Sequence, residues 1–259
     1  MKRNHDDSLS GNETGNNNQY EETLSMMRTM RLGHMAQKYT DLHEDVNYGL
    51  NNPDRVVYDL ISSEYYARKA NRLQRDIKTA HLKYPQASLD ETLEDPSRKI
   101  GTDLINSLAE CTWIKDHKNL LITGQSGTGK THIMCALAIC ALQKGYKVLY
   151  TKASLMINEL IETAVTGGYN PCLKKYTDPH LLIIDDYGLM SLDINKCHQM
   201  FEVLDARDGE KSTAVLSQYK VDRWYEMFTN AVYADSCMSR LIHNAYRIQL
   251  EGKDMRKGK

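Results

Sequence analysis

The sequence lacks the features that mark a membrane protein, a secreted protein or a structural zinc site. No apolar run among its 259 residues approaches the roughly 18 that a membrane-spanning helix needs. The N-terminus is charged and rich in Asn, without the apolar segment of a secretory signal. The six cysteines include no C-x-x-C pair, so we expect free thiols. These absences predict a cytoplasmic protein with no membrane partner.

An excess of charge of either sign is also missing, because 33 Lys and Arg face 34 Asp and Glu. A net charge of −1 does not exclude nucleic acid as a partner, since local patches rather than totals bind phosphates. The hydrophobic share of 41% is close to the globular average and excludes wholesale disorder. The length suits one large domain or two modest ones.

The composition changes twice along the chain and predicts three parts. Residues 1–19 are polar with a single Leu, which predicts a flexible tail. Residues 20–103 are predicted as an N-terminal helical domain and its linker, with a helix that starts at Pro53 and ends before Pro85. Within that helix, apolar residues recur every three or four positions: Tyr66, Ala70, Leu73, Ile77, Ala80 and Tyr84.

Residues 104–259 alternate short apolar runs with helical patterns, which predicts an α/β domain. The run at 181–185 is apolar without interruption, as is typical of a strand buried on both faces. We therefore expect a parallel sheet flanked by helices. The predicted strands are 119–123, 146–151, 181–185, 212–217 and 246–251, and the predicted helices are 103–113, 131–144, 153–165, 196–205, 222–228 and 236–244.

A glycine-rich loop between the first strand and the helix after it fits the phosphate-binding pattern G-x-x-x-x-G-K-[ST]. Its glycines let backbone N–H groups turn toward phosphates, and the helix adds its positive end. Lys130 is expected to reach the β- and γ-phosphates, and Thr131 to bind Mg²⁺. The predicted nucleotide-binding residues are Gly124, Gln125, Ser126, Gly127, Thr128, Gly129, Lys130, Thr131 and His132.

Polar residues at the ends of two later strands supply candidates for hydrolysis. Asp185 ends a buried strand and is expected to hold Mg²⁺, while Asp186 is positioned to polarise the attacking water. Ser217 and Gln218 end the next strand, and either side chain could orient that water. Together with Lys130 they form the predicted catalytic set, with ATP and Mg²⁺ as cofactors.

GTP is a poorer fit to the residues. Asp185-x-x-Gly188 satisfies one GTPase motif, but the candidate guanine clamp at residues 195–198 reads Asn-Lys-Cys-His and lacks the required Asp.

Basic residues outside the loop can be interpreted in two ways. The helix from Tyr66 to Tyr84 carries bases opposite its apolar stripe, which suits either a DNA backbone or a solvated face. Arg240, on a predicted helix, is by itself most often a salt-bridge former. The candidate DNA contacts are Arg68, Lys69, Arg72, Arg75 and Lys78.

With these residues in hand, the chain resembles the IstB family of transposition helper ATPases, which is related to the DnaC-like helicase loaders in the AAA+ class. The resemblance runs from about Tyr20 to Lys257. Its most specific block begins at Ser239-Arg240-Leu241 and ends at Arg247-Ile248. The other matching segments are residues 22–24, 30–36, 64–80, 113–114, 127–132, 182–188, 212–218 and 221–224.

The resemblance implies an AAA+ ATPase that oligomerises on duplex DNA and assists a transposase. It places Arg240 at the arginine-finger position, acting on a neighbouring subunit, and makes the basic helix a DNA-contact region. The chain departs from the family's usual pattern at Ser239 and at Gln125-Ser126, and the residues after Arg247 are too few for the helical lid of many AAA+ proteins. The alternatives are a DnaC-like replicative helicase loader and, from other classes, a scaffold that uses ATP as a structural clamp or a small-molecule kinase.

Overall fold

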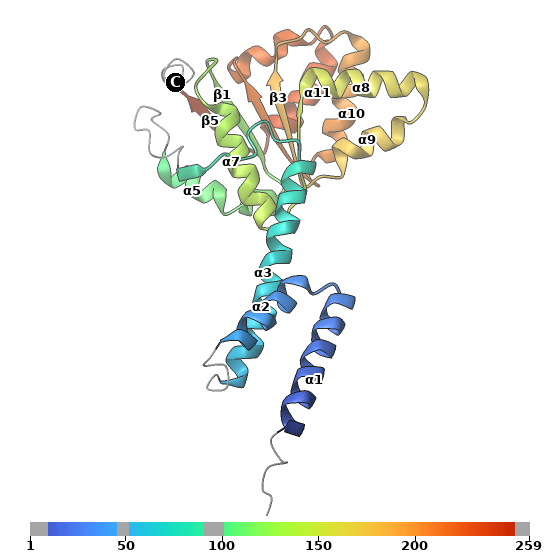
Figure 1. The fold of residues 1–259 in the computed structure, drawn as a ribbon. Helices are drawn as coiled ribbons and strands as arrows, with labels where there is room; N and C mark the ends of the chain where they lie inside the picture. The colour runs from blue at the N-terminus through green and yellow to red at the C-terminus, as the bar shows by residue number, and fades with distance from the viewer. Residues whose placement is uncertain (1–9, 46–51, 91–100, 252–259) are drawn as a thin grey trace, which may run out of the picture. The chain divides into compact units, whose positions relative to one another are not determined.

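The computed structural model describes residues 10–45, 52–90 and 101–251, and the chain divides into two compact units, Met1–Arg72 and Leu73–Lys259 (Figure 1). The division falls inside helix α3 (Pro53–Thr79), earlier than the boundary between residues 103 and 104 that the sequence suggests. The reason is packing, because Leu73 and Ile77 lie against the hydrophobic core of the second unit.

The first unit consists of α1 (Ser10–Thr29), α2 (Gly33–Glu44) and the first part of α3. The ring of Tyr20 on α1 packs on Tyr39 and His43 of α2, and its hydroxyl donates to Thr40 Oγ1 at 3.2 Å. Helix α1 begins at Ser10, so residues 10–19, expected in a flexible tail, are helical; a helix anchored by packing extends at one hydrogen bond per added residue. Residues 1–9 of that predicted tail lie outside the described residues.

The second unit contains a five-stranded sheet in the order β2-β3-β4-β1-β5, and all the pairings are parallel. The predicted parallel sheet is therefore confirmed, and the fourth strand has the predicted bounds. The strands are β1 (Asn119–Gly124), β2 (Val148–Lys152), β3 (Leu181–Tyr187), β4 (Ser212–Ser217) and β5 (Ala245–Leu250).

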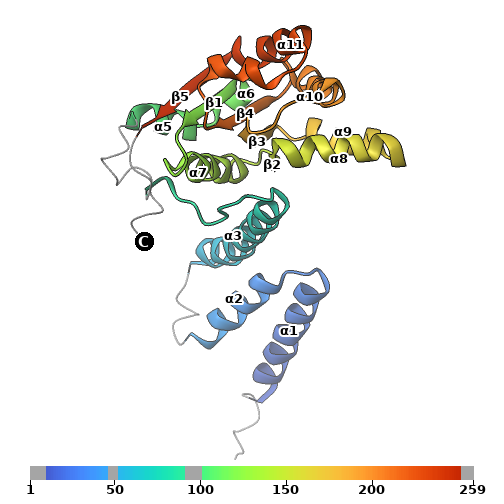
Figure 2. The same cartoon turned by 90° about the horizontal axis from the view of Figure 1, so that it is seen from above.

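Successive residues of each central strand enter two different cores, one on each face of the sheet (Figure 2). Leu120 and Ile122 of β1 pack with residues of α7, whereas Leu121 packs with residues of α8, α10 and α11. This burial on both faces explains why the strands are apolar without alternation. The flanking elements are α5 (Thr102–Ala109), α6 (Thr112–Lys115), α7 (Lys130–Gln143), α8 (Ala153–Thr166), α9 (Tyr169–Thr177), α10 (Ile194–Arg207), the 3-10 helix η3 (Val221–Met227) and α11 (Ala231–Ile242).

Several helices differ from the sequence expectation. Helix α3 ends at Thr79, before the predicted end at Tyr84. The helix predicted over 103–113 is broken at Cys111, whose φ of 60° separates α5 from α6. Helix α9 follows Gly167-Gly168, in a segment for which the sequence gives no expected element. Helix α11 begins at Ala231, before the predicted residue 236, since the Asn230 side chain accepts from Val232 N and Tyr233 N and caps it.

Both tryptophans of the chain anchor the second unit. Trp113 and Trp224 are 2% and 0% exposed. Each indole N–H donates to a backbone carbonyl, that of Leu108 at 3.0 Å and that of Tyr219 at 3.1 Å, so neither ring is buried with an unsatisfied donor.

None of the helices described here is long and apolar enough to cross a bilayer. The described residues end just after β5, so the predicted lack of a helical lid lies outside them.

Candidate nucleotide-binding site

The predicted phosphate loop joins the end of β1 to the start of α7, and only glycine fits its turning points. Gly124, Gly127 and Gly129 have φ values of 152°, 85° and 87°. A Cβ on Gly124 would lie 2.4 Å from the carbonyl oxygen of Leu250, a contact that backbone cannot accommodate. The loop therefore keeps the open backbone that phosphate binding requires.

Lys130 is the first residue of α7 and is 8% exposed. Its ammonium donates to the carbonyl oxygens of Gly124 and Gln125 at 2.7 and 2.8 Å. The charge thus lies inside the loop, beside the N-terminus of α7, where an anion would be favoured.

The structure brings the two predicted magnesium residues together. The Thr131 hydroxyl donates to Asp185 Oδ2 at 2.9 Å, although the residues are 54 positions apart in the sequence. Asp185 is 4% exposed and is the last of the five buried residues that begin β3. A hydroxyl and a carboxylate are hard oxygen ligands of the kind that Mg²⁺ prefers, so the residues present fit this ion.

Asp186 lies beside Asp185 at the same edge of the sheet, in a left-handed backbone conformation with φ of 57°. Its carboxylate is 2.8 Å from Lys152 Nζ, at the end of β2. The hydrogen bond and charge of Asp186 raise the pKa of Lys152. The side chain of Asp186 is one-third exposed, as a group that contacts water in the reaction must be.

Ser217 and Gln218 end β4 at this edge, in different surroundings. The Ser217 hydroxyl is buried, donates to Tyr187 O at 2.6 Å and accepts from Tyr219 N at 3.1 Å, so both bonds go to the backbone. The Gln218 side chain is exposed. Of the two, Gln218 is the residue available to orient a water, a role that stays a prediction.

Arg240 is not brought to the phosphate loop of its own chain. Its carbonyl accepts from the Asn119 side chain at 2.8 Å, and Asn119 begins β1 whereas the phosphate loop follows the end of β1, about 16 Å further along a strand of this length. The guanidinium donates to Asp205 Oδ1 and lies over the Phe201 ring at 4.7 Å. It is therefore held at the surface, about one-quarter exposed.

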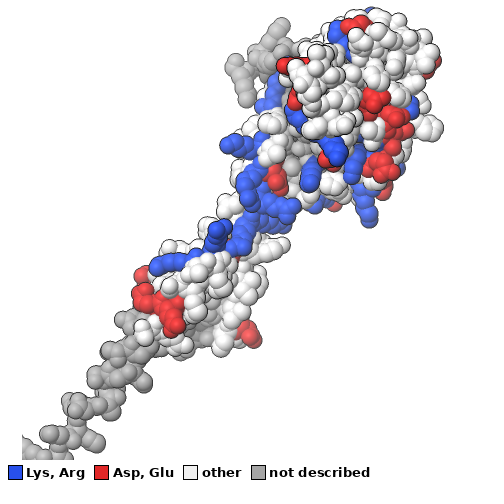
Figure 3. Space-filling model, turned by 90° about the vertical axis from the view of Figure 1, so that its right-hand side faces the viewer, with Lys and Arg blue, Asp and Glu red and all other residues white. Residues whose placement is uncertain are grey.

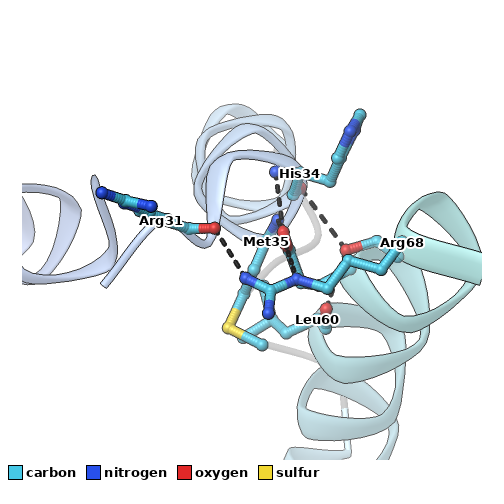
Figure 4. A network of polar contacts seen from close by, with 7 residues as sticks. Arg31, His34, Met35, Leu60 and Arg68 are labelled. Carbon is cyan, nitrogen blue, oxygen red and sulfur yellow. Dashed lines mark hydrogen bonds and ion pairs between the residues drawn. The ribbon is translucent and has the colours of Figure 1, made fainter. Parts of the chain in front are cut away.

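The basic residues predicted to bind DNA all have exposed positions on α3, and Lys and Arg side chains gather over the second half of this helix (Figure 3). Arg68 is held by contacts within the first unit. It donates to Glu64 Oε1 and to the Arg31 carbonyl, each at 2.7 Å (Figure 4). Arg68 thus has a structural role, and the predicted DNA contacts best supported by exposure are Lys69, Arg72, Arg75 and Lys78.

Two residues of β2 belong to the site although the sequence did not single them out. Tyr150 donates to Asp185 Oδ2 at 2.7 Å, and Lys152 pairs with Asp186. Both lie there because β2 adjoins β3, with Lys152 in register with Asp185. The signal that could have found them is their position near the end of the second predicted strand, once β2 is known to neighbour β3.

Comparison with known proteins identifies a family. A family model described as IstB-like ATP binding protein matches residues 25–259. An insertion sequence ATP-binding protein of Sinorhizobium fredii is 33% identical over 236 residues, which cover 91% of this chain and 94% of that protein. Another, of Pseudomonas fluorescens, is 34% identical over 197 residues, which cover 76% and 85%.

Solved structures share the fold over about two-thirds of the chain, at lower identity. The DnaC helicase loader has a TM-score of 0.55 at 19% identity, covering 65% of this chain and 99% of that chain. DnaA of Aquifex aeolicus bound to AMPPCP has a TM-score of 0.55 at 21% identity, covering 68% and 53%. The chain has the AAA+ P-loop fold, and it belongs to the family of IstB-like ATP-binding proteins.

Proposed function

We propose that this protein is an ATPase that assembles on duplex DNA while ATP is bound and assists the transposase of an insertion sequence. The observation that carries the proposal is the meeting of Lys130, Thr131, Asp185 and Asp186 at one edge of the sheet. The insertion-sequence names of its relatives support the transposase as partner.

The residues of this edge divide the chemistry of phosphoryl transfer among them. Lys130 and the loop N–H groups bind the phosphates, and Thr131 and Asp185 hold Mg²⁺, which neutralises phosphate charge when it is bound. Asp186 accepts a proton from the attacking water, and Gln218 orients that water.

Arg240 supplies transition-state charge to the neighbouring subunit. Its place far from its own phosphate loop supports a role in trans. ATP held between subunits then stabilises the assembly, and hydrolysis releases or remodels it.

DNA binds through the exposed bases of α3. A row of Lys and Arg side chains favours contacts to the phosphate backbone, which position a protein without reading sequence. We expect a triple change of Lys69, Arg75 and Lys78 to Gln to reduce the slope of log K for DNA binding against log salt concentration. The reduction should correspond to about two to three fewer phosphate contacts. Lys174→Gln with Lys220→Gln, exposed lysines elsewhere, should leave it unchanged.

The decisive experiment measures duplex DNA binding and particle size with ATP, with ADP and without nucleotide. We expect large DNA-bound particles with ATP only, and longer-lived particles for Asp186→Asn because hydrolysis is blocked. DNA binding and particle size that do not respond to nucleotide would overturn the proposal.

A replicative helicase loader is the alternative. The DnaC likeness is 19% identical and extends to the fold alone, whereas the insertion-sequence relatives match over nine-tenths of the chain. Binding to a replicative helicase, but not to a transposase encoded next to this gene, would favour the loader.

A further inference from the structure

Strand β2 is the edge strand of the sheet, and the segment that follows α3 contacts its outer side. Strand β2 pairs with β3 on one side. On its other side, Tyr150 N donates to the carbonyl oxygen of Ala80 at 2.9 Å. We call residues 80–87, which begin with Ala80, the strap.

The strap is packed into the second unit rather than lying loosely on it. Ala80, Leu82 and Ala87 are 0%, 8% and 7% exposed and belong to the core that also holds Tyr150 and residues of α7. The Tyr84 ring lies 5.8 Å from that of His132, in the first turn of α7. The strap is therefore in contact with the same turn that carries Lys130 and Thr131.

Tyr150 joins this strap to the predicted magnesium site through two different groups. Its backbone N–H binds the strap, and its hydroxyl donates to Asp185 Oδ2 at 2.7 Å, the oxygen that also accepts from Thr131. The side chain is buried, and burial followed by the Asp185 contact raises the pKa of Tyr150 far above its ordinary value. The phenol therefore keeps its proton and remains a donor.

We propose that Tyr150 is a positioning residue, which aims the Asp185 carboxylate and couples occupation of the magnesium site to the docking of the strap on β2. The inference rests on the proposed function, because it assigns a regulation to that same site. A change at Asp185 reaches the strap through one residue, Tyr150, whose hydroxyl contacts Asp185 and whose backbone N–H contacts the strap. The strap in turn continues α3, so the nucleotide state and the end of α3 are linked.

The test compares Tyr150→Phe with Tyr176→Phe in the full chain. Each change removes one buried hydroxyl that donates to a carboxylate, but the partner of Tyr176 is Glu159, outside the site. Two quantities are measured: the factor by which Mg²⁺ strengthens ATP binding, by calorimetry, and the amide hydrogen exchange of residues 80–87 with and without Mg²⁺ and ADP.

We expect Tyr150→Phe to reduce the Mg²⁺ factor about tenfold, the scale of one hydrogen bond to a charged group. It should also abolish the slowing of exchange that the nucleotide causes in the strap, while Tyr176→Phe behaves as wild type. Equal behaviour of the two variants would overturn the inference. If the wild type binds nucleotide but neither hydrolyses it nor binds DNA, the proposed function fails instead.

A second variant approaches the coupling from the strap. Tyr84 is 41% exposed, so Tyr84→Ala should fold even if Tyr150→Phe does not. We expect faster exchange in the strap and a smaller Mg²⁺ factor than in wild type. A strap that loosens with no change in Mg²⁺ response would also overturn the inference.

Discussion

Gly124 shows how one residue fixes the geometry of the phosphate loop. Its φ of 152° and the 2.4 Å approach of the Leu250 oxygen to a Cβ at this place each exclude a side chain. Gly145, just after the end of α7, has a positive φ as well, 87°, but open space around it. Alanine at Gly145 would therefore meet backbone strain alone, whereas alanine at Gly124 would meet both strain and a steric collision.

We expect Gly124→Ala to abolish ATP binding and to lower the unfolding free energy by at least about 2 kcal/mol more than Gly145→Ala, because strand β5 must move. Gly145→Ala should cost only the roughly 1–2 kcal/mol of a left-handed Ala. Calorimetric ATP titration and thermal unfolding measure the two effects. Similar losses in both variants would contradict the steric argument.

At the scale of elements, α2 depends on a residue of α3 for its start. Its N-cap is Leu32, which has no side-chain cap. Glu64 supplies the missing acceptor, since Oε2 accepts from His34 N at 2.9 Å and Met35 N at 3.1 Å. Burial alone would raise the pKa of Glu64, but the bonds from Arg68, Met35 and His34 outweigh it and lower the pKa below 4.5.

Because the folded pKa of Glu64 is depressed, its contribution to stability is present above pH 4.5 and is lost as the pH falls through the folded value. We expect Glu64→Gln to weaken α2 by about 1–3 kcal/mol at neutral pH and to remove this acid dependence. Amide exchange across residues 31–45 measures the change. Glu226→Gln, in an exposed ion pair, serves as control, and α2 exchange that is equally slow in both variants would refute the cap.

Arg207 joins the end of α9 to the start of β4. It is 1% exposed and donates to the carbonyls of Tyr176, Pro179 and Ser212 and to the Thr213 hydroxyl. Removing it leaves several buried acceptors without a donor.

We therefore expect Arg207→Leu to lower the unfolding free energy by at least about 3 kcal/mol. Arg223→Leu breaks the exposed pair with Glu226 and the contact over the Tyr219 ring, and it should cost about 1 kcal/mol or less. Thermal unfolding of the two variants measures the difference. A small effect of Arg207→Leu would mean that water replaces the guanidinium.

The sequence predicts those features of the fold and the site that depend on residues close together in the chain, and it misses those that depend on how distant segments pack. The bounds of β4 and the meeting of Thr131 with Asp185 follow from an apolar run and from two known motifs. The parts played by Tyr150 and Lys152 require the order of the strands, which no local pattern contains. Arg68 looks like any exposed base until the Arg31 carbonyl to which it donates, 37 positions away, is placed in space.

At the scale of the whole molecule, the site requires two copies if Arg240 acts in trans. Arg240→Ala and Asp186→Asn should each bind ATP and lose hydrolysis, because every interface in either assembly lacks one of these two side chains. Mixed, they should recover up to about a quarter of the wild-type rate, since some interfaces combine an intact Asp186 with an intact Arg240. ATPase assays on the mixture measure this.

Asp186→Asn mixed with Lys130→Ala is the matched control. Each change disables the nucleotide site of the subunit that carries it, so no interface in this mixture has an intact site. Recovery in the control, or none in the test mixture, would contradict a role in trans.

The placement of the two tryptophans gives the molecule an intrinsic optical probe of one unit. Trp113 and Trp224 both lie in the second unit, so indole fluorescence reports the unfolding of that unit, while far-ultraviolet dichroism also follows α1 and α2. Trp224 packs against Tyr187, with ring centres 4.8 Å apart, and Tyr187 directly follows Asp186. Its emission is therefore placed to register nucleotide binding without any label.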